Sequence, residues 1–519
     1  MTQKPPVEKE TAESRLQPAP PTLAERSFTA LKWNYLGAAA RVGSQLVIGV
    51  LLARLLGPEP FGLVAIAWFV IGLGNLISDL GFGSALVQRE IVHVEDTRFV
   101  FTILVLVAMI MTITVVSTAG LVSEFFRRPD AIPVIQVLGL LFVVQAFGQV
   151  SASLLRRELN FKVVQIAQVS SYLIAYLGLG LPLALVGAGV WSLVSAAIGQ
   201  AVLVSAMLFA ARPHTVVPLL RPRGDGMLRF GSTVMGSNIA NFTINNIDTA
   251  IIGRAFGAVD LGLYSRALQL VSTPMNAVLS NLSAVLFPAY SQAQTNASSL
   301  RKTYFASLTL VGLVCLPALA AIAVIPETVI VGLYGSNWNA AAPLLAPLSL
   351  GIAVTALLAL SGPLLMGIGR PSVEFRAQAI SAVITALALM LAANYSLVVL
   401  AWTLFSVFLI RFYLVTRNAL QATKGRWLDV LRALLFPLVI ASTTATAVKA
   451  VDLLASVSEI PPGLRLLLAA CAGALSLMTS FIALRSWIIS ENVAWFVRGI
   501  EGRLPEFVKR ILLSNPTRR

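Results

Sequence analysis

The chain has 519 residues, of which 57% are hydrophobic and 12% charged, and its mean hydropathy is +0.83. This composition excludes an ordinary soluble surface, so lipid must solvate most of the protein. The formal net charge of +15 is what many membrane spans with basic cytoplasmic connections produce, and we expect no nucleic-acid binding. Two cysteines and two histidines provide neither a disulfide framework nor zinc-ligand spacing.

Apolar runs of about 20 residues, the length that spans a bilayer, recur along the chain after a polar, proline-rich start. Residues 1–30 are predicted to be a disordered cytoplasmic tail. A first six-helix bundle is expected over 31–212, with spans at 33–55, 59–81, 98–122, 132–155, 163–185 and 188–211.

A basic cytoplasmic connection over 213–228 leads into the second half of the chain. The second six-helix bundle is expected over 229–418, with spans at 229–253, 261–289, 303–326, 341–367, 374–393 and 396–416. An extra helix pair over 427–488 has spans at 428–450 and 463–486, and a basic cytoplasmic tail covers 489–519.

The sequence therefore predicts an all-α integral membrane protein with about fourteen transmembrane helices. They form two pseudo-symmetric six-helix bundles and a C-terminal helix pair. With the N-terminus in the cytoplasm, most basic residues fall in inner connections, as the positive-inside rule requires. Both termini are then cytoplasmic. The basic residues left on the outer side are Arg54, Arg127, Arg128, Arg254, Lys449 and Arg465.

An internal repeat relates the two bundles. Residues 54–63 read RLLGPEPFGL and residues 254–263 read RAFGAVDLGL, so the spacing of Arg54, Gly57 and Gly62 matches that of Arg254, Gly257 and Gly262. We call these two segments the repeat turns. Each joins the first two spans of its bundle, as a duplicated bundle predicts. The repeats are parallel, and transporters of this kind bind substrate between their halves near mid-depth. The glycines alone have a simpler explanation, a tight turn with φ > 0.

Polar side chains within the spans are candidates for a substrate cavity, because an ionisable group in a membrane helix is costly. Arg41 and Gln45 share one face of the first span at i and i+4. The repeat register points to the seventh span, where polar residues recur at i, i+3, i+7 and i+10. These are Asn238, Asn241, Asn245 and Asp248. Arginine suits phosphate oxygens and amides suit hydroxyls, although amides also pair between membrane helices as structural contacts.

Three further ionisable residues have two interpretations each. Arg266 in the eighth span belongs either to the cavity or, with Arg254, to an interfacial anchor. Asp248 and Asp79 are candidates for binding a proton or sodium ion that drives transport, and Asp79 could equally form an ion pair with a neighbouring arginine. No metal site and no other cofactor are predicted.

Several motifs resemble the Wzx-type polysaccharide exporters of the multidrug/oligosaccharidyl-lipid/polysaccharide (MOP) superfamily. They include LLARLLGPEPFGLVAIAWFVIGLGNLISDLGFGSALVQRE, LLRRELNFK, NIDTAIIGRAFGAVDLGLYSRALQL, LFPAYSQ and LYGSNWNAAAPLL, in order over roughly 33–420. The resemblance implies two six-helix bundles around a cationic cavity in the bacterial inner membrane. It further implies that polyprenyl-pyrophosphate-linked oligosaccharide crosses there by alternating access. Polysaccharide polymerase and chain-length proteins are the implied partners.

Three alternatives stand beside this flippase hypothesis. An enzyme of the same pathway is disfavoured because short outer connections offer no convergent acid, base or metal groups. A multidrug extruder of the same superfamily would usually have twelve spans and an acidic cavity. A lipid II flippase fits the same features, and the exported glycan is not encoded in any motif.

Overall fold

The computed structural model describes residues 23–78, 86, 92–219, 246–294, 296–369 and 371–483. Within these ranges the regular structure is helical. Twelve helical segments are long and apolar enough to cross a bilayer, which identifies an all-α, multi-pass membrane protein.

The N-terminal half consists of helices connected by short turns. Its elements are α1 (Leu23–Leu56), α2 (Pro58–Ser78), α4 (Val94–Phe126), α5 (Ala131–Gly139), α6 (Leu141–Arg157), α7 (Phe161–Ala175), the π-helix η2 (Tyr176–Gly180), α8 (Leu181–Leu185) and α9 (Val190–Ala211). The fourth span combines α5 with α6, and the fifth runs through α7, η2 and α8.

The C-terminal half begins with a helical stretch over 246–255. Its further elements are α11 (Ala258–Ala293), α12 (Ala297–Val324), α13 (Pro326–Tyr334), the 3-10 helix η3 (Ser336–Ala341), α14 (Ala342–Leu358), α15 (Ser361–Gly367), α16 (Pro371–Ala392) and α17 (Leu397–Thr423). Two more helices, α18 (Trp427–Val457) and α19 (Pro462–Ala483), form the terminal pair.

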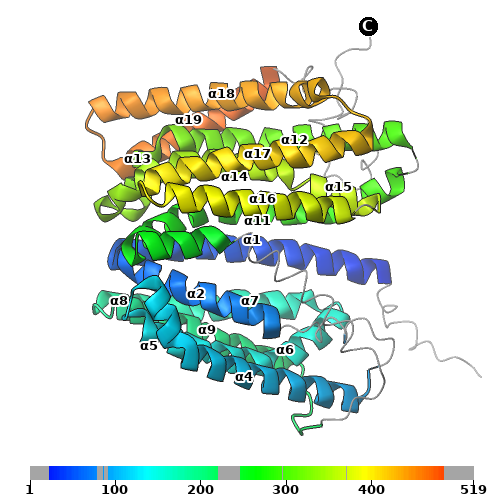
Figure 1. Ribbon diagram of the computed structural model, residues 1–519, viewed down its shortest axis with the longest axis vertical. Coiled ribbons are helices and arrows are strands. Elements are labelled where there is room, and N and C mark those ends of the chain that lie inside the picture. The colour runs from blue at the N-terminus through cyan, green and yellow to red at the C-terminus, as the bar shows by residue number, and fades with distance from the viewer. Residues whose placement is uncertain are drawn as a thin grey trace, which may run out of the picture.

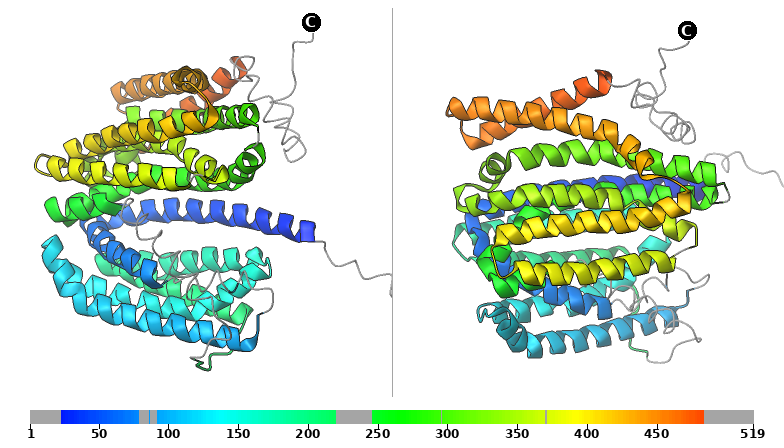
Figure 2. Two further views of the ribbon diagram at one scale, coloured as in Figure 1. Left: turned by 45° about the vertical axis from the view of Figure 1, so that its right-hand side comes forward. Right: turned by 45° about the horizontal axis from the view of Figure 1, so that its top comes forward.

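The long helices run side by side in two groups (Figure 1). Helices α2 to α9 form one group, α11 to α17 form the other, and α1 lies along their boundary. The terminal pair covers the outer flank of the second group, and the three views agree on this order (Figure 2). Helix α18 packs along α12, where a Cβ atom on Gly312 would lie 2.9 Å from Pro437.

Local sequence explains where many helices begin. Proline occupies the start of α2, α13, α16 and α19, where its missing N–H is no loss. Asn296 and Ser396 cap α12 and α17 by accepting hydrogen bonds from backbone N–H groups, as capping residues do. Prolines also lie inside α12, α14 and α18. In α18 the carbonyl of Ala433, four residues before Pro437, accepts a 3.0 Å hydrogen bond from Thr309 of α12, as neighbouring membrane helices satisfy carbonyls freed by proline.

Two boundaries differ from the sequence prediction. Helix α1 begins at Leu23, inside the segment predicted to be a disordered tail, because no proline or glycine follows Pro21 until Gly37. Helix α11 has 36 residues, about 54 Å at 1.5 Å per residue, and contains the predicted span 261–289. It is not among the twelve spans. Most of the predicted span 229–253 lies outside the described residues.

Candidate functional site

The two repeat turns hold the halves together at one end of the molecule. Gly57 and Gly257 have φ angles of 69° and 87°, which L-residues adopt only with strain. Just beyond them α2 and α11 cross in backbone contact at Gly62 and Gly262. Because α1 and α2 belong to the first half and α11 to the second, this crossing closes the space between the halves at that end.

The repeat arginines reach across the boundary in reciprocal fashion. Arg54 donates hydrogen bonds of 2.6 and 2.5 Å to the carbonyl oxygens of Leu333 and Gly332 at the C-terminal end of α13. Arg254 donates bonds of 2.6 and 3.3 Å to the carbonyls of Phe125 and Glu124 in the last turn of α4. Cations are favourable at helix C-termini, where carbonyls lack helical partners. Each arginine therefore ties its own half to the other.

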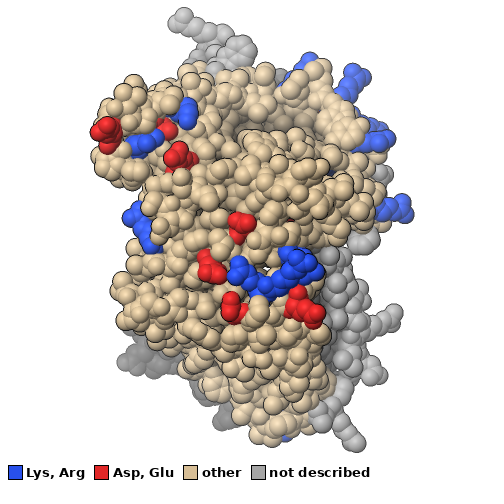
Figure 3. Space-filling view, turned by 60° about the vertical axis from the view of Figure 1, so that its left-hand side comes forward, with Lys and Arg blue, Asp and Glu red and all other residues tan. Residues whose placement is uncertain are grey.

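A buried tryptophan adds a third link at the same end. Trp338, in η3, is fully buried and donates its indole N–H to the carbonyl of Ala53 in α1 over 2.8 Å. Its ring lies 5.6 Å from Phe61 and 5.3 Å from Tyr334. Figure 3 views the molecule from this side and shows charged side chains gathered at the centre of the face. In the first repeat turn, Glu59 forms an ion pair with Arg128 at 3.3 Å.

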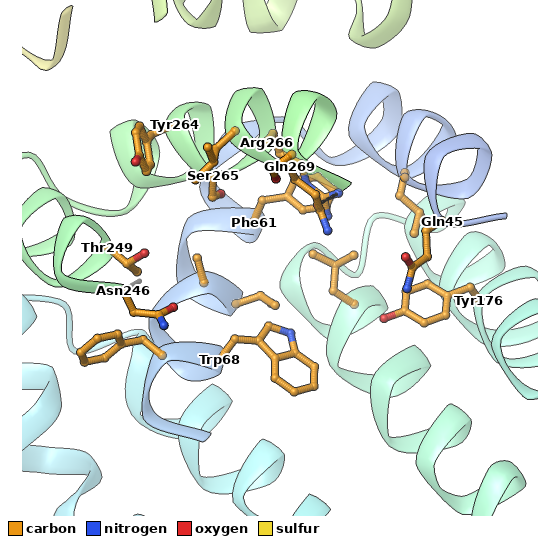
Figure 4. A pocket seen from close by; sticks show the side chains of 18 of the residues that line it. Gln45, Phe61, Trp68, Tyr176, Asn246, Thr249, Tyr264, Ser265, Arg266 and Gln269 are labelled. Carbon is orange, nitrogen blue, oxygen red and sulfur yellow. Dashed lines mark hydrogen bonds between the residues drawn. The ribbon is translucent and has the colours of Figure 1, made fainter. Parts of the chain in front are cut away.

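A polar cavity of about 580 Å³ lies between the halves next to this contact. Its wall comes from α1, α2, α7, η2, α9, the stretch 246–255 and α11 (Figure 4). The volume lies within the range of roughly 300 to 1,000 Å³ that is typical of small-molecule sites. Among the described lining residues Arg266 carries the single formal charge. The lining amides and small hydroxyls are Gln45, Gln200, Asn246, Thr249, Ser265, Gln269 and Ser272.

Arg266 is positioned from three helices. It is carried by α11, and its Cζ atom lies 3.7 Å from the centre of the Phe61 ring in α2, a favourable cation–π distance. Its Nη1 atom donates a 2.8 Å hydrogen bond to Gln269 Oε1 one turn along α11. A Cβ atom placed on Gly49 of α1 would lie 3.4 Å from the Nη1 atom of Arg266. The guanidinium is thus fixed between the halves with its planar fork beside the cavity.

The structure brings two of the predicted cavity residues together, since Gln45 and Arg266 both line this space. The geometry fits the interpretation of Arg266 as a cavity residue. Arg254 lies apart from it and binds the end of α4. Arg41 does not belong to the lining. It donates a 2.8 Å hydrogen bond to Gln168 Oε1 of α7, one turn from the bond between Gln165 Nε2 and Asn34 Oδ1.

The predicted stripe on the seventh span is described only at its end. Asn238, Asn241, Asn245 and Asp79 lie outside the described residues. Asp248 is buried and accepts hydrogen bonds from Tyr264 Oη at 2.5 Å and from the Thr249 N–H at 2.8 Å. Within the described part of this helix, Asn246 and Thr249 line the cavity. The cavity role of the stripe and the ion-coupling role of Asp248 stay predictions.

Sequence reasoning missed the aromatic part of the wall. Five aromatic residues from the first half line the cavity: Phe61, Trp68, Phe69, Tyr172 and Tyr176. A signal for the tyrosines exists, because Gln165, Gln168, Tyr172 and Tyr176 recur at helical spacing on the fifth span. Trp68 and its neighbours on α2 give no such signal, since an aromatic residue in an apolar run is equally typical of a packed core.

Long apolar helices around a polar cavity define a multi-pass membrane protein with the architecture of a transporter. The solved structure of "Lipid II flippase MurJ, inward closed conformation" has the same fold, with a TM-score of 0.68 and 12% identity over 89% of this chain and 100% of that one. The family model "Polysaccharide biosynthesis protein" matches residues 51–343.

Named relatives point to the same family. The chain is 30% identical over 370 residues to "Succinoglycan biosynthesis transport protein ExoT" of Rhizobium meliloti strain 1021, covering 70% of this chain and 74% of that protein. It is 28% identical over 336 residues to "Lipopolysaccharide biosynthesis protein WzxC" of Escherichia coli strain K12, covering 62% and 66%. The chain belongs to the polysaccharide biosynthesis protein family, the Wzx-type group of the MOP superfamily.

Proposed function

We propose that the protein is a flippase that translocates polyprenyl-pyrophosphate-linked oligosaccharide repeat units across the bacterial cytoplasmic membrane. The product would serve surface polysaccharide synthesis, as exopolysaccharide, capsule or lipopolysaccharide O-antigen. The observation that carries the proposal is the cavity between the halves, where Arg266 is the one formal charge among the described lining residues and amides also line the wall. Arginine binds phosphate oxygens through its planar fork, and amides both donate to and accept from sugar hydroxyls.

The closed end supports transport by alternating access. In our assignment the repeat turns face the outer side, both termini are cytoplasmic, and the chain has fourteen spans, including 229–253 and α11. The arginine links of the repeat turns then form the outer closure, and substrate enters from the inner leaflet. Release requires those links to break while the opposite end closes, because one site must serve both faces in turn. Polysaccharide polymerase and chain-length proteins are the proposed partners.

The electrostatics favour an anionic cargo over the cationic substrates of a multidrug extruder. Among the described lining residues, a cationic drug would meet Arg266 and no carboxylate, and the nearby Asp248 accepts a hydrogen bond from Tyr264. The likeness to a lipid II flippase concerns the fold, whereas the named sequence relatives belong to polysaccharide biosynthesis. The names of these relatives thus support polysaccharide precursor over lipid II as the substrate class.

Deletion of the gene tests the proposal directly. We expect loss of the surface polysaccharide and accumulation of its lipid-linked precursor in the inner leaflet, measured by extraction and by mass spectrometry. Complementation with the wild-type chain restores export, and Arg266→Gln at the same membrane level restores little of it. Unchanged polysaccharide with new sensitivity to cationic dyes would instead support a drug pump. Rescue of a strain that lacks its lipid II flippase would support that alternative.

A further inference from the structure

The aromatic residues of the cavity divide into two sets by what they contact. Phe61 is covered by the Arg266 guanidinium and by Trp338, and Phe69 packs edge-on against Phe126 at 6.0 Å. These rings are engaged within the protein. Trp68 retains 41% exposure although it lines the cavity, and within the described residues its indole N–H has no acceptor. Figure 4 shows Trp68 and Tyr176 on helices of the N-terminal half, and Arg266 with Gln269 on α11 at the opposite side of the cavity.

The backbone around Tyr176 is built differently from the rest of its span. Helix α7 ends at Ala175, and the π-helix η2 begins at Tyr176. The wider turn is marked by the hydrogen bond from the Leu181 N–H to the Tyr176 carbonyl. Such turns are rare and occur frequently at functional sites. Here the turn begins at a cavity residue whose ring lies 4.3 Å from that of Tyr172 at an interplanar angle of 30°.

We infer that Trp68 and Tyr176, with Tyr172 behind Tyr176, form a sugar-stacking wall, separate from the phosphate-binding subsite at Arg266 and Gln269. This inference rests on the proposed function and assigns the two parts of the substrate head group to different halves of the protein. A pyranose ring presents C–H groups on its faces and hydroxyls around its edge. The C–H face matches the electron-rich face of an aromatic ring, while edge hydroxyls match amides such as Gln45 and Gln200.

The charge and the position of the lining residues explain why the diphosphate and the sugar are assigned to different halves. The diphosphate needs a cation, and among the described lining residues that cation is on α11 of the second half. The aromatic wall lies on α2 and η2 of the first half. A head group that touches both walls contacts both halves, next to the place where Arg266 of α11 packs on Phe61 of α2. The wall discriminates glycosylated from bare lipid pyrophosphate, because the bare lipid contacts the cation alone.

Binding to the purified full-length protein in nanodiscs tests the wall with two probes. They are undecaprenyl pyrophosphate and the same lipid pyrophosphate carrying one glucose residue. We expect the wild type to bind the glycosylated probe about fivefold more tightly, the effect of one aromatic contact of ordinary strength. Trp68→Ala removes this preference and leaves the affinity for the bare probe unchanged. Trp68→Phe keeps most of the preference. Arg266→Gln weakens the binding of both probes.

Trp402 supplies the matched control, because it has 44% exposure on α17 and does not line the cavity. Trp402→Ala should leave both affinities unchanged. Equal weakening of both probes by Trp68→Ala, or no preference in the wild type, overturns the sugar-stacking wall while the flippase proposal stands. Failure of the wild type to bind either probe overturns both. Trp68-dependent binding of ethidium in place of the glucose-bearing probe assigns the wall to flat cations and overturns the inference.

Discussion

Gly62 and Gly262, two hundred positions apart in the chain, each face the repeat turn of the other half. A Cβ atom on Gly62 would lie 1.7 Å from the carbonyl oxygen of Ala258, and one on Gly262 would lie 2.0 Å from the carbonyl oxygen of Pro58. The contact is reciprocal, as a pseudo-twofold relation between the halves requires. Backbone here meets backbone, so no side-chain rotation can make room for even one methyl group.

We therefore predict that Gly62→Ala opens the repeat-turn end. Overpacking costs the contact about 1 to 3 kcal/mol, and each 1.4 kcal/mol shifts the ratio of open to closed protein about tenfold. A cysteine placed at cavity residue Ser265, with Cys315 and Cys471 replaced, reports the change. A membrane-impermeant maleimide added outside cells should label it faster in Gly62→Ala than in the parent.

Gly120→Ala is the matched control for that experiment. It also adds a methyl group to a helical glycine, in α4, but an ideal Cβ there meets nothing within 4 Å. Labelling should match the parent. If Gly62→Ala is no more accessible than Gly120→Ala, the glycine contact does not hold the end closed.

The arginine links make a second prediction. Arg54 and Arg254 each donate two hydrogen bonds to carbonyl oxygens of the opposite half, and bonds to a charged group contribute about 1.5 to 3 kcal/mol. Arg54→Gln and Arg254→Gln should each raise outside labelling of the Ser265→Cys reporter, and the double variant should raise it further. Arg127→Gln changes a neighbouring arginine, the C-cap of α4, that has no cross-half bond among the described residues, and it serves as the comparison. Equal labelling in all variants would mean that the links do not stabilise the closure.

How much of this contact the sequence predicts depends on the type of information each residue carries. The matched spacing of Arg54, Gly57 and Gly62 with its second copy is visible in the chain, and it predicts related turns. A positive φ explains Gly57 and Gly257, but Gly62 and Gly262 lie within helices and are needed for close approach. Which backbone approaches which is a property of the assembled halves, so no local pattern could have indicated it.

The cavity residues also fall into those that the sequence indicates and those that it does not. Arg266 and Gln45 stood out because polar residues in apolar spans are costly, and both line the cavity. Trp68 could not be found this way, because an aromatic residue costs nothing in lipid or in a packed core. On the seventh span, Asn246 lines the cavity although the predicted stripe did not include it, and the stripe residues that precede it lie outside the described residues.

Arg41 supplies a third prediction, because its hydrogen bond to Gln168 allows two roles to be separated. Arg41→Gln removes the charge while retaining an amide that can bond to Gln168. We expect this variant and Arg41→Ala to impair polysaccharide export at an unchanged protein level in the membrane, through loss of a cation that guides the pyrophosphate. Export is measured as surface polysaccharide and the protein level by immunoblot. Normal export by Arg41→Gln would restrict Arg41 to helix packing.

The terminal helix pair is connected to the closure at the repeat turns through α13. Asp452 of α18, only 4% exposed, accepts hydrogen bonds from Thr328 of α13 at 2.6 Å and from Arg465 of α19 at 2.9 Å. At the other end of α13, a Cβ atom on Gly332 would lie 3.0 Å from the carbonyl oxygen of Pro462 in α19. The carbonyl of this same Gly332 binds Arg54. The terminal helix pair thus fixes α13, the helix whose carbonyl oxygens accept hydrogen bonds from Arg54.

We predict that Asp452→Asn both destabilises the protein and loosens the closure. Removing one member of a buried ion pair costs on the order of 3 kcal/mol, because Arg465 keeps its charge without a carboxylate. Thermal unfolding, followed by fluorescence-detected size exclusion, should shift to lower temperature. Because α13 then moves relative to Arg54, outside labelling of the Ser265→Cys reporter should rise, though less than in Arg54→Gln.

Asp429→Asn separates the two effects, because Asp429 also lies on α18 and pairs with Arg301 of α12 at 2.7 Å. That pair joins α18 to α12, at the end of α18 away from α13. The control should lower the unfolding temperature and leave the reporter as inaccessible as in the parent. Asp452→Asn with lowered stability and unchanged labelling would leave the terminal pair as a packing element without influence on the closure. Labelling raised equally by both variants would show that the reporter responds to lost stability alone.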